Sequence, residues 1–86
     1  MQADTKKAAR KAQREHWRRA AVAVISATRR DADISQEELA KRLGWSRAKL
    51  GSVESGRRKL AFEDFPMIAL ALGIDPEKLF SRVAKW

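Results

Sequence analysis

The 86-residue sequence predicts an all-α fold of five helices. Ala, Leu, Lys, Arg and Glu, which favour helix, are abundant, while β-branched residues do not alternate as they would in strands. The four Gly and two Pro residues are few, and most of them separate segments whose apolar residues recur at helical spacing. A chain of this length forms one domain, and the tight turns favour an orthogonal bundle over an up-and-down one.

The first helix is expected over about residues 15–30. An apolar face is formed by Ala21, Val24, Ile25 and Thr28. Arg29 and Arg30 are expected largely off this face. Residues 5–14 favour helix but have almost no apolar side chain to bury, so residues 1–14 are either a helix extension or a mobile basic arm, and residues 15–86 form the domain. The cations of the arm are Lys6, Lys7, Arg10, Lys11 and Arg14.

Two serine caps mark the next helices. Ser35 is the expected N-cap of a helix over 36–43, where Glu38 would complete a capping box. Gly44 ends that helix, because glycine readily adopts a positive φ. Ser46 caps a helix over about 47–54, which Gly56 closes. The expected buried residues of the pair are Leu39, Ala40, Leu43, Leu50 and Val53.

The last two helices are delimited by prolines. Pro66 is tolerated only in the first turn of a helix, so the fourth helix is expected to begin near Asp64 and to end at Gly73. Asp75 caps the fifth, with Pro76 at its first position. The residues expected to face inward are Leu60, Phe62, Phe65, Ile68, Ala69 and Leu72, followed by Leu79, Phe80 and Val83.

Residues 36–55 have the pattern of a helix-turn-helix. Two helices that cross through a short turn need a small residue at the crossing and a permissive one at the corner, and Ala40 and Gly44 fit these positions. Trp45 is expected to pack in the core at the turn. In this motif the second helix enters the major groove of DNA with its N-terminal residues against the bases.

The charge distribution agrees with a nucleic-acid partner. Residues 1–30 carry nine positive and two negative side chains, a net of +7, and residues 44–60 carry five and one, a net of +4, within a total of +8. Concentrated positive charge is typical of a surface that meets a polyanion. Charge alone would also fit a solubilising surface or an anionic membrane.

Other classes of function lack the residues they need. There is no cysteine and only one histidine, His16, so no metal site, cofactor or catalytic nucleophile and base are predicted. No apolar run approaches the ~20 residues that span a bilayer, and no secretory signal begins the chain. We therefore expect a cytoplasmic protein that is not an enzyme and does not bind membranes.

Residues 34–80, ISQEELAKRLGWSRAKLGSVESGRRKLAFEDFPMIALALGIDPEKLF, resemble the Cro/phage-repressor-type helix-turn-helix family, also called XRE. The most specific segments are SQEELAKRLG, VESG and ALGIDPEKLF. The resemblance implies a five-helix, lambda-repressor-like domain that binds operator DNA, usually as a dimer. Gly51 and Pro66 depart from the common pattern of the family.

Residue roles follow from this geometry. Arg47 is expected to donate two hydrogen bonds to a guanine, and Ala48, Lys49 and Ser52 are its expected neighbours at the bases. The residues expected at phosphates are Gln36, Ser46, Ser55, Arg57, Arg58 and Lys59. Glu54 is instead expected to pair with an arginine of the same domain. The basic arm would add affinity that is independent of sequence.

The predicted function is transcriptional repression through a near-palindromic operator of double-stranded DNA. A homodimer is expected, with Phe80, Val83 and Trp86 of the last helix at its interface. The same domain would serve an antitoxin, with a toxin as its protein partner, or a restriction-modification controller. A protein-interaction adaptor on a helix-turn-helix scaffold is the alternative from another class.

Overall fold

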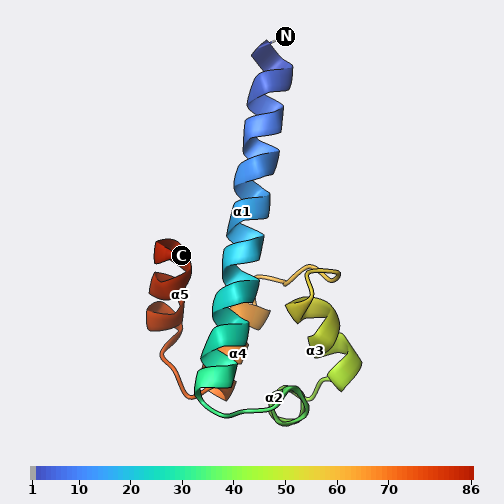
Figure 1. Cartoon of the computed structure of the whole chain (residues 1–86), viewed down its shortest axis with the longest axis vertical. Coiled ribbons are helices and arrows are strands. Elements are labelled where there is room, and N and C mark those ends of the chain that lie inside the picture. Colours follow the sequence, from blue (N-terminus) through green and yellow to red (C-terminus); the bar gives the residue numbers. More distant parts are fainter. Residues whose placement is uncertain (1) are drawn as a thin grey trace.

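The structure, a computed structural model, describes the backbone of residues 2–86 and the side chains of residues 5–86. Within that range it consists of five helices without strands: α1 (Gln2–Asp31), α2 (Gln36–Leu43), α3 (Arg47–Glu54), α4 (Asp64–Ala71) and α5 (Pro76–Lys85). The four short helices surround the C-terminal half of α1, and its N-terminal half extends beyond them (Figure 1). The predicted all-α class is confirmed.

One hydrophobic core joins all five helices. Its largest fully buried side chains are Ile25, Leu39, Leu50, Val53, Ile68 and Leu79, so every helix contributes at least one. Fully burying such a side chain stabilises the fold by about 1.5–3 kcal/mol. Because each short helix packs against at least one other element, the core fixes the positions of α2 and α3 relative to α1.

Residues 5–14, for which the sequence left an arm or a helix extension open, belong to α1 and are fully on the surface. Their Ala, Lys, Arg and Gln side chains have high helix propensity. The segment continues a helix that the core already holds, so it extends that helix without the cost of a new nucleus. The result is a projecting helical segment whose cations face solvent.

The serine caps form as expected. Ser35 Oγ accepts the backbone N–H of Glu38 at 3.0 Å, and Ser46 Oγ accepts that of Lys49 at 3.1 Å. The side chain of Glu38 does not complete the expected capping box, because its Oε1 accepts from Arg42 Nε at 3.1 Å. Arg42 Nη1 also donates to the carbonyl of Ala71 at 2.9 Å, which ties α2 to the end of α4.

The corner between α2 and α3 depends on a left-handed glycine. Gly44 has φ +71°, and the N–H of Trp45 donates to the carbonyl of Ala40 at 2.9 Å. This bond closes the turn that separates the two helices.

Alanine substitutions at two glycines are expected to change stability in opposite directions. A Cβ at Gly44 or at Gly51 would have no heavy atom within 4 Å, so neither change causes a clash. Gly44→Ala should lower the free energy of unfolding by about 1–2 kcal/mol, because an L-residue is strained at positive φ. Gly51→Ala, inside α3, should raise it by about 0.8–1 kcal/mol. Urea unfolding measures both, and changes of the same sign would contradict this account.

The expected start of α4 at Asp64 is confirmed, with Pro66 in the first turn. Two inward orientations are wrong: Phe62 is 89% exposed and Phe80 is 54% exposed. Phe62 lies in the turn before α4, where helical spacing does not apply. Phe80 lies on the outer edge of α5, and its ring stacks on that of Trp17 with 6.0 Å between centroids.

Candidate nucleic-acid interface

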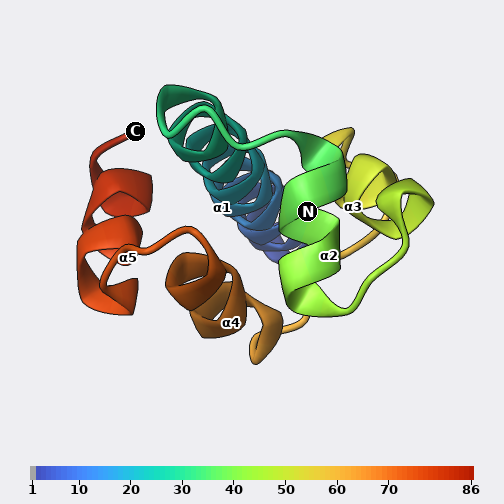
Figure 2. The ribbon, with the colours of Figure 1, turned by 90° about the horizontal axis from the view of Figure 1, so that it is seen from below.

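The helix-turn-helix lies on the side of the bundle away from α5 (Figure 2). α2 and α3 pack against each other, and Ala40 in α2 is only 2% exposed. A larger side chain there would force the helices apart. Ala40 and the left-handed Gly44 together set the angle at which α2 and α3 cross, and this angle decides which side of α3 faces solvent.

The outer side of this motif is concave. A hollow of about 320 Å³, which we call the α3 hollow, is lined by Gln36, Arg47, Ala48, Gly51, Ser52 and Arg57. The structure thus brings together one residue from the start of α2, four from α3 and one from the loop after α3. The sequence predicts DNA contacts for five of these, and the sixth is Gly51, whose missing side chain leaves the backbone accessible.

The cations around the α3 hollow are available to an external partner. The side chains of Arg47 and Arg57 are exposed, as are those of Arg58 and Lys59. Among the described residues none of the four forms an ion pair. An unpaired guanidinium presents its donors in the fork that matches a guanine edge or a phosphate.

The other residues predicted to contact DNA lie outside the α3 hollow. Lys49 is half-buried, and its Nζ lies 4.1 Å from the centroid of the Trp45 ring in a cation–π contact. Trp45 itself is half-buried against the core, as expected. Ser46 caps α3, and Ser55 Oγ donates to the carbonyl of Ser52 at 3.1 Å. The two hydroxyls and the Lys49 ammonium therefore already have partners within the chain.

A buried ion pair supports the interface from behind. Arg29 Nε donates to Glu54 Oε2 at 2.8 Å, and Arg29 Nη2 donates to Oε1 at 3.0 Å. This confirms the expected pairing of Glu54 with an arginine. The expected position of Arg29 off the core face is wrong, because the residue is only 8% exposed. Its third hydrogen bond, from Nη1 to the carbonyl of Ile34 at 2.9 Å, holds the turn before α2.

Glu54 also positions Gln36. Gln36 Nε2 donates to Glu54 Oε1 at 3.1 Å, so the buried pair links α1, the start of α2 and the end of α3. Burial raises the pKa of Glu54, but the hydrogen bonds from Arg29 and Gln36 outweigh this and hold that pKa below its ordinary 4.5. The ionised carboxylate therefore orients the amide of Gln36. The sequence predicts a pairing of Glu54 with an arginine but has no signal for its contact with Gln36, which lies 18 residues away in the chain.

The predicted dimer residues differ in their accessibility. Val83 is 3% exposed and belongs to the core, so a second chain can reach only Phe80 and Trp86 of this set. These two are each 54% exposed and belong to an aromatic cluster: Phe80 contacts Trp17 and Phe65, and Trp86 contacts His16. The burial of Val83 follows from its position four residues after Leu79, which places both on the inner face of α5.

Residues 5–86 contain no group of three or more His, Cys, Asp or Glu side chains that could hold a metal ion. None of the described helices has the length and apolarity required to cross a bilayer.

Comparisons with known proteins agree with this geometry. The sequence profile of the family described as "Helix-turn-helix domain" matches residues 8–79. No curated protein sequence matches the chain. Among solved structures, an XRE-family like protein from Pseudomonas syringae pv. tomato str. DC3000 has a TM-score of 0.83 and 28% identity, over 90% of this chain and 94% of that one.

Two further structures are similar. The clp gene regulator ClgR from C. glutamicum has a TM-score of 0.73 and 26% identity, over 80% of this chain and 90% of its own. The wild-type restriction-modification controller protein C.Esp1396I has a TM-score of 0.76 over 80% of this chain and 91% of its own, and at 22% identity it supports the fold alone. The chain belongs to the helix-turn-helix domain family, and it is a helix-turn-helix protein of the XRE type.

Proposed function

We propose that this protein is a DNA-binding transcription regulator, and specifically a repressor that binds a near-palindromic operator as a homodimer. The observation that carries the proposal is the α3 hollow, where Arg47 and Arg57, which have no ion-pair partner among residues 5–86, flank the exposed surface of the second helix of a helix-turn-helix. The similarity to an XRE-family like protein and to a clp gene regulator supports a regulatory role.

In the proposed complex α3 lies in the major groove. Arg47, at the first position of α3, reads a guanine, while the methyl group of Ala48 contacts a neighbouring thymine. The start of α2 faces a phosphate, to which Gln36 offers the amide N–H that it does not donate to Glu54. Arg57 contacts the backbone beyond the recognition helix, and Arg58 and Lys59 extend this clamp.

The proposed dimer uses the exposed aromatic rings of Phe80 and Trp86. Large apolar side chains that stay half-exposed in a monomer mark surfaces that a partner covers. A two-fold axis would set the two α3 helices about one DNA turn, ~34 Å, apart. Selection of bound sequences from a random DNA pool tests the whole proposal. A palindromic motif with this spacing is expected, and enrichment of no motif would refute sequence-specific binding.

The projecting N-terminal half of α1 is proposed to contact DNA without regard to sequence. Arg10→Gln combined with Arg14→Gln should weaken binding to specific and random duplexes equally. The slope of log K against log salt should also become shallower by about 0.9 for each phosphate that the variant no longer neutralises. A matched control removes two exposed cations of α5, Lys78 and Lys85. Equal salt slopes for the two double variants would show that the extension does not touch DNA.

A further inference from the structure

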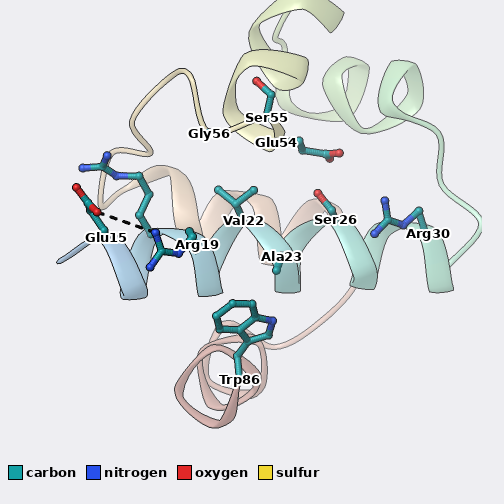
Figure 3. Close-up of a pocket in the computed structure, with 11 residues that line it drawn as sticks. Glu15, Arg19, Val22, Ala23, Ser26, Arg30, Glu54, Ser55, Gly56 and Trp86 are labelled. Atoms are coloured by element: carbon teal, nitrogen blue, oxygen red, sulfur yellow. Dashed lines mark ion pairs between the residues drawn. The ribbon is translucent and has the colours of Figure 1, made fainter. Parts of the chain in front are cut away.

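A second concave surface lies mostly outside the helix-turn-helix, on the side of α1. A groove of about 560 Å³ runs along α1, between the C-terminal end of α3 and Trp86 at the end of α5 (Figure 3). Arg19, Val22, Ala23, Ser26 and Arg30 of α1 contribute to its lining. We call this surface the α1 groove. It shares no lining residue with the α3 hollow, and its Trp86 also belongs to the surface of the proposed dimer.

Both ends of the α1 groove are positively charged. Arg19 lies toward one end and Arg30 at the other (Figure 3), and Arg18, the neighbour of Arg19 in the chain, also lines the groove. Arg18 and Arg30 have no ion-pair partner among the described residues, whereas Arg19 forms an ion pair at 4.0 Å with Glu15, a half-buried residue that also lines the groove. The carboxylate of Glu54 in the wall is already neutralised by Arg29. The groove therefore carries a net positive charge, and within the described chain two of its three arginines, Arg18 and Arg30, have no ion-pair partner.

The middle of the α1 groove is apolar. Val22 and Ala23 are half-buried, and Trp86 is 54% exposed. In Figure 3 Val22 points toward the wall formed by Ser55, and Ala23 points toward the indole ring of Trp86. Apolar surface between two cationic ends is complementary to a partner with apolar residues in its middle and carboxylates at both ends.

The distance between the charged ends of the groove favours a helical partner over a small anion. Arg19 and Arg30 are eleven residues apart on one helix, which separates their backbones by ~16 Å and places them on nearly the same face, since eleven residues are close to three turns. This distance exceeds what one small anion bridges. A partner helix that lies along α1 has the same rise per residue, so two of its carboxylates that are eleven residues apart would reach Arg19 and Arg30.

We propose that the α1 groove binds an acidic amphipathic helix of another protein, at a surface separate from the α3 hollow. The apolar face of that helix would contact Val22, Ala23 and the ring of Trp86, and its terminal carboxylates would pair with the three arginines. Because Trp86 also belongs to the surface of the proposed dimer, the acidic helix would compete with a second copy of the chain for this ring.

A designed peptide tests this proposal with the full chain in the absence of DNA. The probe is a fluorescein-labelled helical peptide of about 16 residues, ~24 Å long, with Glu pairs at both ends and Leu and Ala between them. Anisotropy should show saturable binding. Removing three groove charges, as Arg18→Gln, Arg19→Gln and Arg30→Gln together, should weaken it roughly tenfold. Trp86→Ala should also weaken it, because the apolar face of the peptide then has less surface to cover.

The matched control removes three exposed charges from the same helix outside the groove, as Lys6→Gln, Lys7→Gln and Arg10→Gln. It should leave peptide affinity within about twofold, since these residues lie at least eight positions, ~12 Å, from Arg18, which is beyond the Debye length of about 8–10 Å. Equal reductions of affinity in the two triple variants would show general charge attraction and overturn the proposal. Equal affinity of the wild-type protein for a scrambled peptide would also overturn the proposal. So would a groove triple variant whose affinity for random duplex DNA falls while its affinity for the peptide stays unchanged.

Discussion

Glu54→Leu is expected to lower the free energy of unfolding by about 3–5 kcal/mol. The side chains of Arg29 and Glu54 are only 10% and 6% exposed, so the substitution leaves a guanidinium buried without its counter-charge. A domain of this size has a total stability of about 4–13 kcal/mol, so the change removes a large fraction of it. Urea unfolding followed by helical circular dichroism measures the decrease.

Two variants separate this buried pair from ordinary surface charge. Arg29→Met combined with Glu54→Leu should regain most of the stability, because an apolar pair fills the same space without an unpaired charge. Glu15→Leu removes the exposed partner of Arg19 and should cost less than about 1 kcal/mol. A double variant no more stable than Glu54→Leu alone would show that the cost comes from packing rather than from the buried charge.

The same pair makes stability depend on pH. The pKa of Glu54 is lowered in the folded protein, so its contribution is fully present above the ordinary pKa of 4.5 and is lost as pH falls through the lowered folded value. The wild type should therefore lose stability on acidification below about pH 5, beyond what the apolar double variant loses. Thermal midpoints across this range measure the difference, and parallel curves would contradict the assignment.

Arg47→Ala is expected to weaken binding to the selected operator by about 1–3 kcal/mol and to relax the preference at one base pair. Its affinity for random DNA should change far less, because a bidentate contact to a guanine carries the discrimination. Since Arg47 is exposed and unpaired within the described chain, the free energy of unfolding should stay the same. Quantitative gel shifts on operator and random duplexes provide the comparison.

The control for this prediction is Arg58→Ala, on the loop after α3. A phosphate contact is independent of base sequence, so this variant should bind every duplex more weakly to the same extent, and the salt slope should fall by about 1. If Arg47→Ala instead weakens operator and random DNA equally, Arg47 contacts the backbone and base reading belongs to another residue of the α3 hollow.

Local features of the fold were predictable because they depend on residues close in sequence. Ser35 and Ser46 cap the helices that follow them, and Gly44 takes the left-handed conformation that its position between two apolar helices requires. Pro66 places the start of α4 correctly, because a proline is accepted only in the first turn. Each of these signals acts within about one turn of helix.

The candidate site was predictable in part. The sequence was sufficient to nominate Arg47 and Ala48, whose positions follow from the start of α3. It did not distinguish them from Lys49, which the structure turns toward Trp45. The orientation of Lys49 depends on where Trp45 of the turn packs, and Trp45 packs against a core that other helices form.

By itself the sequence determined the helices, their caps, the helix-turn-helix and the two basic segments, because propensity, capping and charge are properties of neighbouring residues. The tertiary structure alone decided that Arg29 is buried, that Glu54 links it to Gln36, that Val83 is in the core, and that Phe62 and Phe80 face solvent. It also formed the α1 groove from three separate helices. These outcomes depend on distances between segments far apart in the chain, which only the packing of α1 against the other helices sets.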